Sequence, residues 1–90
     1  MQWYIVDDAL IGQPPLVRTM ILRAERNDGL YNIIWNATAQ AWEQNNAALR
    51  YFNDGTATLV SEDEARMWAE RLGTSLQTAL DVLAEFVRRE

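Results

Sequence analysis

The stretch LVSEDEARMWAERLG, residues 59–73, decides the fold because it marks the change from strands to helices. Ser61, followed three residues later by Glu64, forms a capping box in which the serine hydroxyl accepts the Glu64 backbone N–H. The acidic residues of the SEDE tract stand in the first helical turn, where the positive end of the helix dipole favours anions. We therefore interpret this tract as the start of a helix and not as a metal or acid–base site.

Apolar residues continue from this start at helical spacing. They predict a first helix over residues 61–73 that ends at Gly73, a residue suited to the left-handed conformation of a helix stop. One face of this helix carries an apolar stripe, formed by Ala65, Trp68, Ala69 and Leu72.

A second helix is predicted over residues 75–88, and its apolar surface is wider than one stripe. Val82 and Phe86 lie four residues apart on its flank. One interpretation is that this helix packs between the first helix and a sheet, which would cover both residues. The other is that Val82 and Phe86 meet a second subunit or another protein.

Residues 1–60 have the pattern of an antiparallel sheet, because aromatic and β-branched residues recur in short runs. Asn27-Asp28-Gly29 between two such runs predicts a β-hairpin. Asp54-Gly55 is interpreted in the same way, between a strand ALRYF (48–52) and a strand TATLV (56–60). We expect a single α+β domain over residues 1–90. It would comprise an N-terminal antiparallel β-meander of about four to six short strands, followed by two C-terminal helices packed on the sheet.

Residues 36–46, NATAQAWEQNN, admit two interpretations. The alanines favour a helix, with Asn36 as its N-cap. The asparagines at 45–46 interrupt that pattern, and Trp35 and Trp42 can instead face each other as an aromatic cross-strand pair. We expect a strand, a turn and a second strand.

The composition removes most catalytic chemistry. The chain contains no histidine, cysteine or lysine, and all eight of its cationic side chains are arginine. The usual neutral-pH base, the thiolate nucleophile and the Schiff-base amine are therefore missing. We expect no enzyme activity, no metal and no cofactor. The lack of cysteine, of a signal-peptide pattern at the start and of a membrane-length apolar run favours the cytoplasm, without a membrane association.

These absences leave binding to a protein partner as the expected function. Tyrosine, tryptophan and arginine are the residues of binding hot spots. If the meander leaves one face open to solvent, the candidate surface consists of Tyr31, Trp42, Arg50 and Tyr51. Among the tryptophans, Trp42 is the one that we expect to be partly exposed, because it lies in the least regular segment.

Two other functions stay open. A structural homodimer would assemble through Val82 and Phe86 of the last helix, as an isologous interface. A decoy would imitate nucleic acid, because the net charge is −5 with eight cations against thirteen anions. Its acidic face would be formed by Asp63, Glu70, Asp81 and Glu85. Direct binding of nucleic acid is not expected of an acidic chain.

The order of a strand, a turn, a tryptophan, then ALRYF and SEDEARMWAERL broadly resembles small accessory proteins of phages and their actinobacterial hosts. The resemblance covers about half of the chain and includes no diagnostic motif, so it transfers no residue roles. It implies a protein that binds and inhibits a host complex, with CRISPR effectors among the targets of such proteins.

Overall fold

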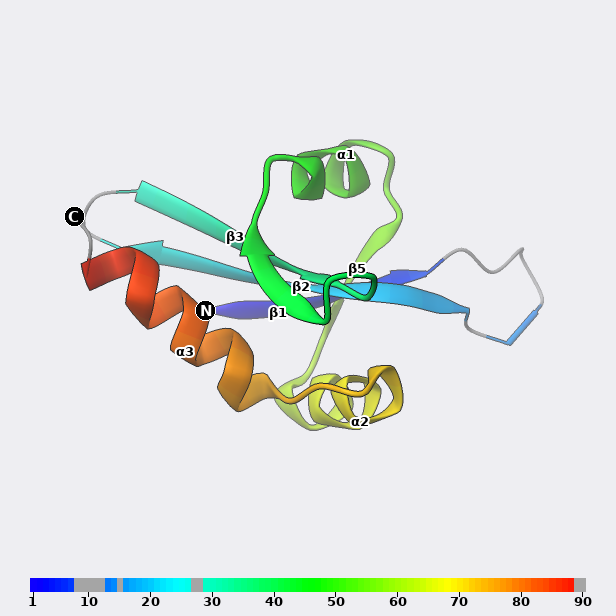
Figure 1. The fold of residues 1–90 in the computed structure, drawn as a ribbon. Helices are drawn as coiled ribbons and strands as arrows, with labels where there is room; N and C mark the ends of the chain where they lie inside the picture. The colour runs from blue at the N-terminus through cyan, green and yellow to red at the C-terminus, as the bar shows by residue number, and fades with distance from the viewer. Residues whose placement is uncertain (8–12, 15, 27–28, 89–90) are drawn as a thin grey trace.

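A computed structural model describes residues 1–7, 13–14, 16–26 and 29–88, and within them it contains a five-stranded antiparallel sheet and three helices (Figure 1). The strands lie in the order β4-β3-β2-β1-β5. They are β1 (Gln2–Asp7), β2 (Val17–Arg26), β3 (Gly29–Asn36), β4 (Ala41–Gln44) and β5 (Ala57–Val60). The helices are α1 (Ala47–Asn53), α2 (Glu62–Leu72) and α3 (Leu76–Arg88). The predicted α+β fold, a meander followed by two packed helices, is confirmed.

The central strands are apolar on both sides. Successive side chains of a strand point to opposite faces, yet four consecutive residues of β2, residues 19–22, are all buried. Both sides therefore have to be covered. Figure 1 shows α2 and α3 on one side of the sheet, which we call the first face, and α1 on the other, which we call the second face.

The first face carries the larger core. Helix α2 packs on β1 and β2, whereas α3 packs on β3 and β4. The two helices follow one another in a single layer (Figure 1), so the expectation that α3 lies between the first helix and the sheet is wrong. Each helix has its own pair of strands to cover. The fully buried side chains of this layer include Met20, Leu22, Ile33, Ala65, Ala69 and Ala79.

Local hydrogen bonds set the bounds of both C-terminal helices as the sequence predicted. The Ser61 hydroxyl accepts the Glu64 N–H at 3.2 Å and caps α2. Gly73, with φ 84°, ends α2 in the left-handed conformation that glycine adopts without a steric penalty. The Ser75 hydroxyl accepts the Thr78 N–H at 3.3 Å and caps α3.

Two of the three predicted hairpins of the meander form. In the first, β2 pairs with β3 up to Arg26 and Gly29, while residues 27 and 28 of the predicted turn lie outside the described residues. In the second, residues 36–46 form a strand, a turn and a strand, with Trp35 opposite Trp42. Asn36 does not cap a helix there, because its side-chain oxygen accepts the backbone N–H groups of residues 38 and 39 in the turn.

The segment ALRYF was predicted to be a strand, and this is wrong because residues 47–53 form helix α1. The Asn45 side chain accepts the Ala47 N–H at 2.8 Å just before the helix begins. Gly55, with φ 75°, follows the end of α1 and leads into β5, so Asp54-Gly55 does not form the expected hairpin turn. The spacing of Ala48, Tyr51 and Phe52 (i, i+3, i+4) is helical, and these residues pack on the second face.

Trp42 is only 5% exposed, so the expectation of a partly exposed side chain is wrong. Its ring lies against Trp35, with centroids 5.6 Å apart, and its indole N–H donates to the hydroxyls of Thr74 (2.9 Å) and Thr78 (3.1 Å). A single side chain on the edge strand β4 thus bonds to the connection between α2 and α3 and to the first turn of α3.

Replacing Trp42 by phenylalanine should destabilise the fold more than the same change at Trp35. Both indoles are about equally buried, but the Trp35 N–H has no hydrogen-bond partner among the described residues. The difference between the two variants therefore isolates the bonds to Thr74 and Thr78. We expect urea unfolding to show an additional loss of about 1 kcal/mol for Trp42→Phe. Equal losses at both positions would contradict this arrangement.

Candidate binding surface

The surface predicted from the sequence does not assemble. Tyr31 and Trp42 are 4% and 5% exposed on the first face, beneath the C-terminal helices. Arg50 and Tyr51 lie on α1, on the other side of the sheet. Tyr31 shares its side of β3 with Ile33 and Trp35, and that is the side which the longer helices cover. These four residues therefore do not form one exposed patch, and the predicted surface is wrong.

Helix α1 is too short to cover the second face. Its 7 residues extend about 10 Å at the rise of an α-helix. The 10 residues of β2 extend about 33 Å. The small core beneath α1 is built around Val6, Ile21 and Ile34. The part of this face nearer to the hairpin between β2 and β3 is left without a covering helix among the described residues.

That uncovered part carries a compact set of side chains, which we call the sheet-face patch. It consists of Tyr4, Arg23, Leu30, Asn32 and Phe52. Arg23 of β2 lies directly opposite Asn32 of β3, and Leu30 lies two residues from Asn32 on the same face. Leu30 is 52% exposed, although it is a large apolar residue. The other four residues of the patch are half-buried, so the patch is partly open to solvent and mixed in chemistry.

Arg23 is held in place at the centre of the sheet-face patch. Its Nε–H donates to the Asn32 side-chain oxygen at 2.9 Å. Its guanidinium carbon lies 3.7 Å from the centroid of the Phe52 ring, a cation–π contact. The Phe52 ring meets Tyr4 edge-on, with centroids 4.8 Å apart. Asn32 and Phe52 thus fix a side chain that otherwise has several rotatable bonds, and Tyr4 supports the Phe52 ring.

The terminal amino groups of Arg23 make no hydrogen bond with the described residues. A planar guanidinium with these groups free can bind a carboxylate or two carbonyl oxygens through a pair of hydrogen bonds. Because Arg23 is already ordered, binding loses less side-chain entropy than a free arginine would lose. The exposed Leu30 supplies apolar area beside it. This combination is typical of a hot spot in a protein interface.

The residues of the predicted dimer face are partly covered by the protein itself. Val82 and Phe86 are half-buried and pack against the core of the first face. A homodimer through them stays a prediction.

The predicted acidic face is exposed on two helices. Asp63 and Glu70 lie on α2, whereas Asp81 and Glu85 lie on α3. Asp63 is already paired, since its carboxylate lies 3.3 Å from the Arg66 guanidinium. An exposed pair of this kind is worth less than about 1 kcal/mol, but it places a cation within the acidic surface. The decoy function also stays a prediction.

The described part of the chain contains neither a carboxylate cluster suited to a metal ion nor a helix suited to crossing a membrane. Within residues 1–7, 13–14, 16–26 and 29–88, no group of three or more aspartates and glutamates comes together to hold a metal ion. None of the described helices is long and apolar enough to cross a membrane.

No protein family matches this chain, and searches of curated proteins and of solved structures find no significant similarity to it. The functional argument therefore depends on the geometry of the chain's own residues.

The pattern of β2 contains the signal that locates the sheet-face patch. In VRTMILRAER, the residues at 20, 22 and 24 are all apolar, whereas the other alternation passes from Ile21 to Arg23 and Glu25. One face is thus apolar between Arg18 and Arg26, and the other becomes polar from Arg23 towards the hairpin. The strand predicted over residues 48–52 would not bring Phe52 to Arg23. Helix α1, which these residues form instead, does.

The contact between Arg23 and Phe52 should be measurable as a coupling free energy. We expect a double-mutant cycle with Arg23→Met and Phe52→Leu, followed by urea unfolding, to give about 0.5–1 kcal/mol. Arg71→Met with Phe52→Leu is the control cycle. Arg71 lies over Trp68 on the other side of the sheet, so this pair should give no coupling. A coupling near zero in both cycles would show that the arginine does not rest on the ring.

Proposed function

We propose that this protein is a non-catalytic protein-binding module whose partner docks on the sheet-face patch. The observation that carries the proposal is Arg23, which Asn32 and Phe52 hold in place while its terminal amino groups make no hydrogen bond with the described residues. The exposed Leu30 beside it adds apolar surface that is otherwise left in water. An ordered arginine with aromatic and aliphatic neighbours supports recognition of a protein surface better than it supports chemistry.

The rest of the chain supports binding over catalysis. It has no histidine, cysteine or lysine, so the side chains that most often transfer protons or attack substrates are missing. A module of this kind acts by covering a surface of its partner. That action fits an inhibitor of a host complex, the activity implied by the resemblance to phage accessory proteins. We place it in the cytoplasm, because a cysteine-free chain needs no oxidising compartment.

Capture of the partner should depend on Arg23 and not on Arg50. We would immobilise the protein, expose it to a lysate of the cells that produce it, and identify bound proteins by mass spectrometry. Nuclease treatment separates protein partners from nucleic acid. Capture at two salt concentrations shows how strongly binding depends on electrostatic attraction. We expect Arg23→Ala to lower the recovered partner at least about tenfold, since hot-spot truncations cost about 2 kcal/mol or more.

Arg50→Ala is the matched control, because Arg50 is an exposed arginine of α1 outside the patch. It should leave recovery unchanged. Circular dichroism should first show that both variants fold. Recovery that depends on Arg50 and not on Arg23 would contradict the proposed site, and recovery of no reproducible partner would contradict the proposed function.

A further inference from the structure

Strand β5 forms one edge of the sheet. It pairs with β1 on its inner side, and no strand of the described residues pairs with its outer side. The Asp7 N–H donates to the Thr56 carbonyl at 3.2 Å. Hydrogen-bonded pairs alternate along an antiparallel ladder, so residues 58 and 60 bond towards β1. The backbone N–H and C=O groups of Ala57 and Leu59 therefore point outwards.

This edge is short, at four residues, but it lacks three other features with which proteins block an open strand. Proline, charged side chains and bulges prevent a second strand from pairing. None of these occurs in β5, whose four residues read ATLV, and its register with β1 is regular. The opposite edge strand, β4, carries Glu43. Leu59 is also 56% exposed, so both the backbone and a large apolar side chain of β5 are open to another molecule.

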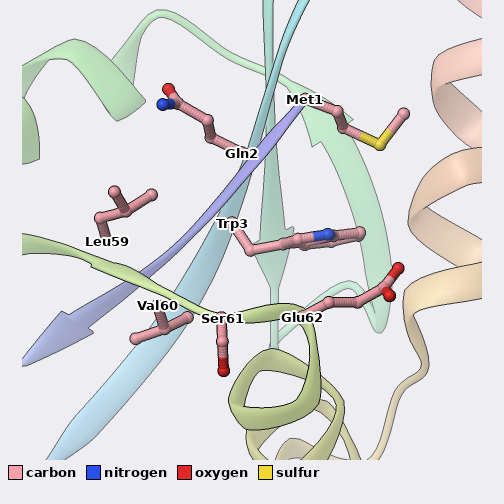
Figure 2. A pocket seen from close by; sticks show the side chains of 7 residues that line it. All are labelled: Met1, Gln2, Trp3, Leu59, Val60, Ser61 and Glu62. Carbon is pink, nitrogen blue, oxygen red and sulfur yellow. The ribbon is translucent and has the colours of Figure 1, made fainter.

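A hollow of about 570 Å³ lies where β5 leads into α2. Residues of β1, β5 and the start of α2 line it, and Figure 2 shows Met1, Trp3 and Glu62 extending towards the same side. Apolar atoms of Met1 and Trp3 thus lie near a carboxylate. A long side chain with an apolar stem and a cationic head matches this combination, since the stem packs on apolar atoms while the head reaches the charge.

Carboxylates stand at both ends of the β5 edge. Asp54 precedes the strand and Glu62 follows it, and both are exposed; the Glu62 carboxylate also lies 3.9 Å from the Arg66 guanidinium in a solvent-exposed ion pair. These charges disfavour a second copy of this chain as the added strand. Antiparallel self-pairing centred on Thr58 places residue 57 opposite residue 59, and it brings the turn that carries Asp54 of one copy to the same end of the pair as the start of α2, with Glu62, of the other. Like charges meet at both ends of such a pair, which costs free energy.

We propose that β5 accepts an added strand from a different protein, with about four uncharged residues between flanking arginines or lysines. This inference rests on the proposed function, since it names the kind of segment that the partner contributes. The main-chain groups of Ala57 and Leu59 bind the backbone of the added strand. Its basic side chains lie beside Asp54 and Glu62, and one of them occupies the hollow next to Met1.

A synthetic peptide of about six residues tests strand addition directly, with valine and threonine alternating between two terminal arginines. We would measure its binding by fluorescence anisotropy and amide hydrogen exchange by NMR. Exchange of the Ala57 and Leu59 N–H groups should slow at least about tenfold, because they gain hydrogen bonds. Exchange at Thr58, which already bonds towards β1, should not change. The proposal is overturned if the peptide does not bind. It is also overturned if the peptide binds without slowing exchange at Ala57 and Leu59 relative to Thr58.

Two altered peptides and two variants complete the test. Every second backbone N–H of the peptide would face β5, and the N–H groups between them would face solvent. N-methylation of the set that faces β5 should abolish binding, whereas N-methylation of the other set should not. Replacing its arginines by glutamates should weaken binding at least about tenfold. Thr58→Lys adds a cation to the edge and should also weaken it. Thr38→Lys makes the same change in the exposed β3–β4 turn and should have no effect.

The two proposals fail separately. If capture of the cellular partner requires Arg23 but is unchanged by Thr58→Lys, strand addition is wrong and the sheet-face patch stands. If the peptide protects Ala57 and Leu59 while Arg23→Ala leaves capture unchanged, the patch is wrong and the edge is the binding site.

Discussion

A sheet whose central strands are apolar on both sides needs other elements to cover both of its faces. In this protein the helices cover one face more fully than the other. Consecutive residues of β2 and of β3 are buried, so neither face can be left to water in full. Two helices of 11 and 13 residues cover the first face, and one of 7 residues covers only part of the second. The exposed sheet-face patch follows from that difference in helix length.

Short-range features could be predicted from the sequence because neighbouring residues decide them. The SEDE start of α2, its glycine stop and the two hairpins depend on hydrogen bonds within a few residues. The side of the sheet on which each residue lies depends on distant segments. Tyr31 and Trp42 have the composition of a binding surface, but α3 covers them. Helix α1 was missed because the Asp54-Gly55 pair after it also fits a hairpin.

Little of the candidate site could be predicted. Tyrosine and arginine were expected in a binding surface, but Arg23 and Phe52 meet only after α1 folds back over the sheet. Tyr4 joins the two proposed surfaces, because it contacts Phe52 and lies opposite Leu59 of β5. A partner strand added at the β5 edge would thus lie beside the sheet-face patch. One partner can contact both surfaces together, which combines main-chain pairing with an arginine contact.

Hydroxyl-radical footprinting of the native protein tests the unequal covering most directly, since it labels each side chain according to its contact with water. The account predicts rapid labelling of Leu30 and Leu59, with Tyr31, Trp35 and Trp42 protected until the protein unfolds. Rapid labelling of Tyr31 and Trp42 in the folded state, with Leu30 and Leu59 protected, would show that α2 and α3 cover the opposite face of the sheet. That result would contradict the account.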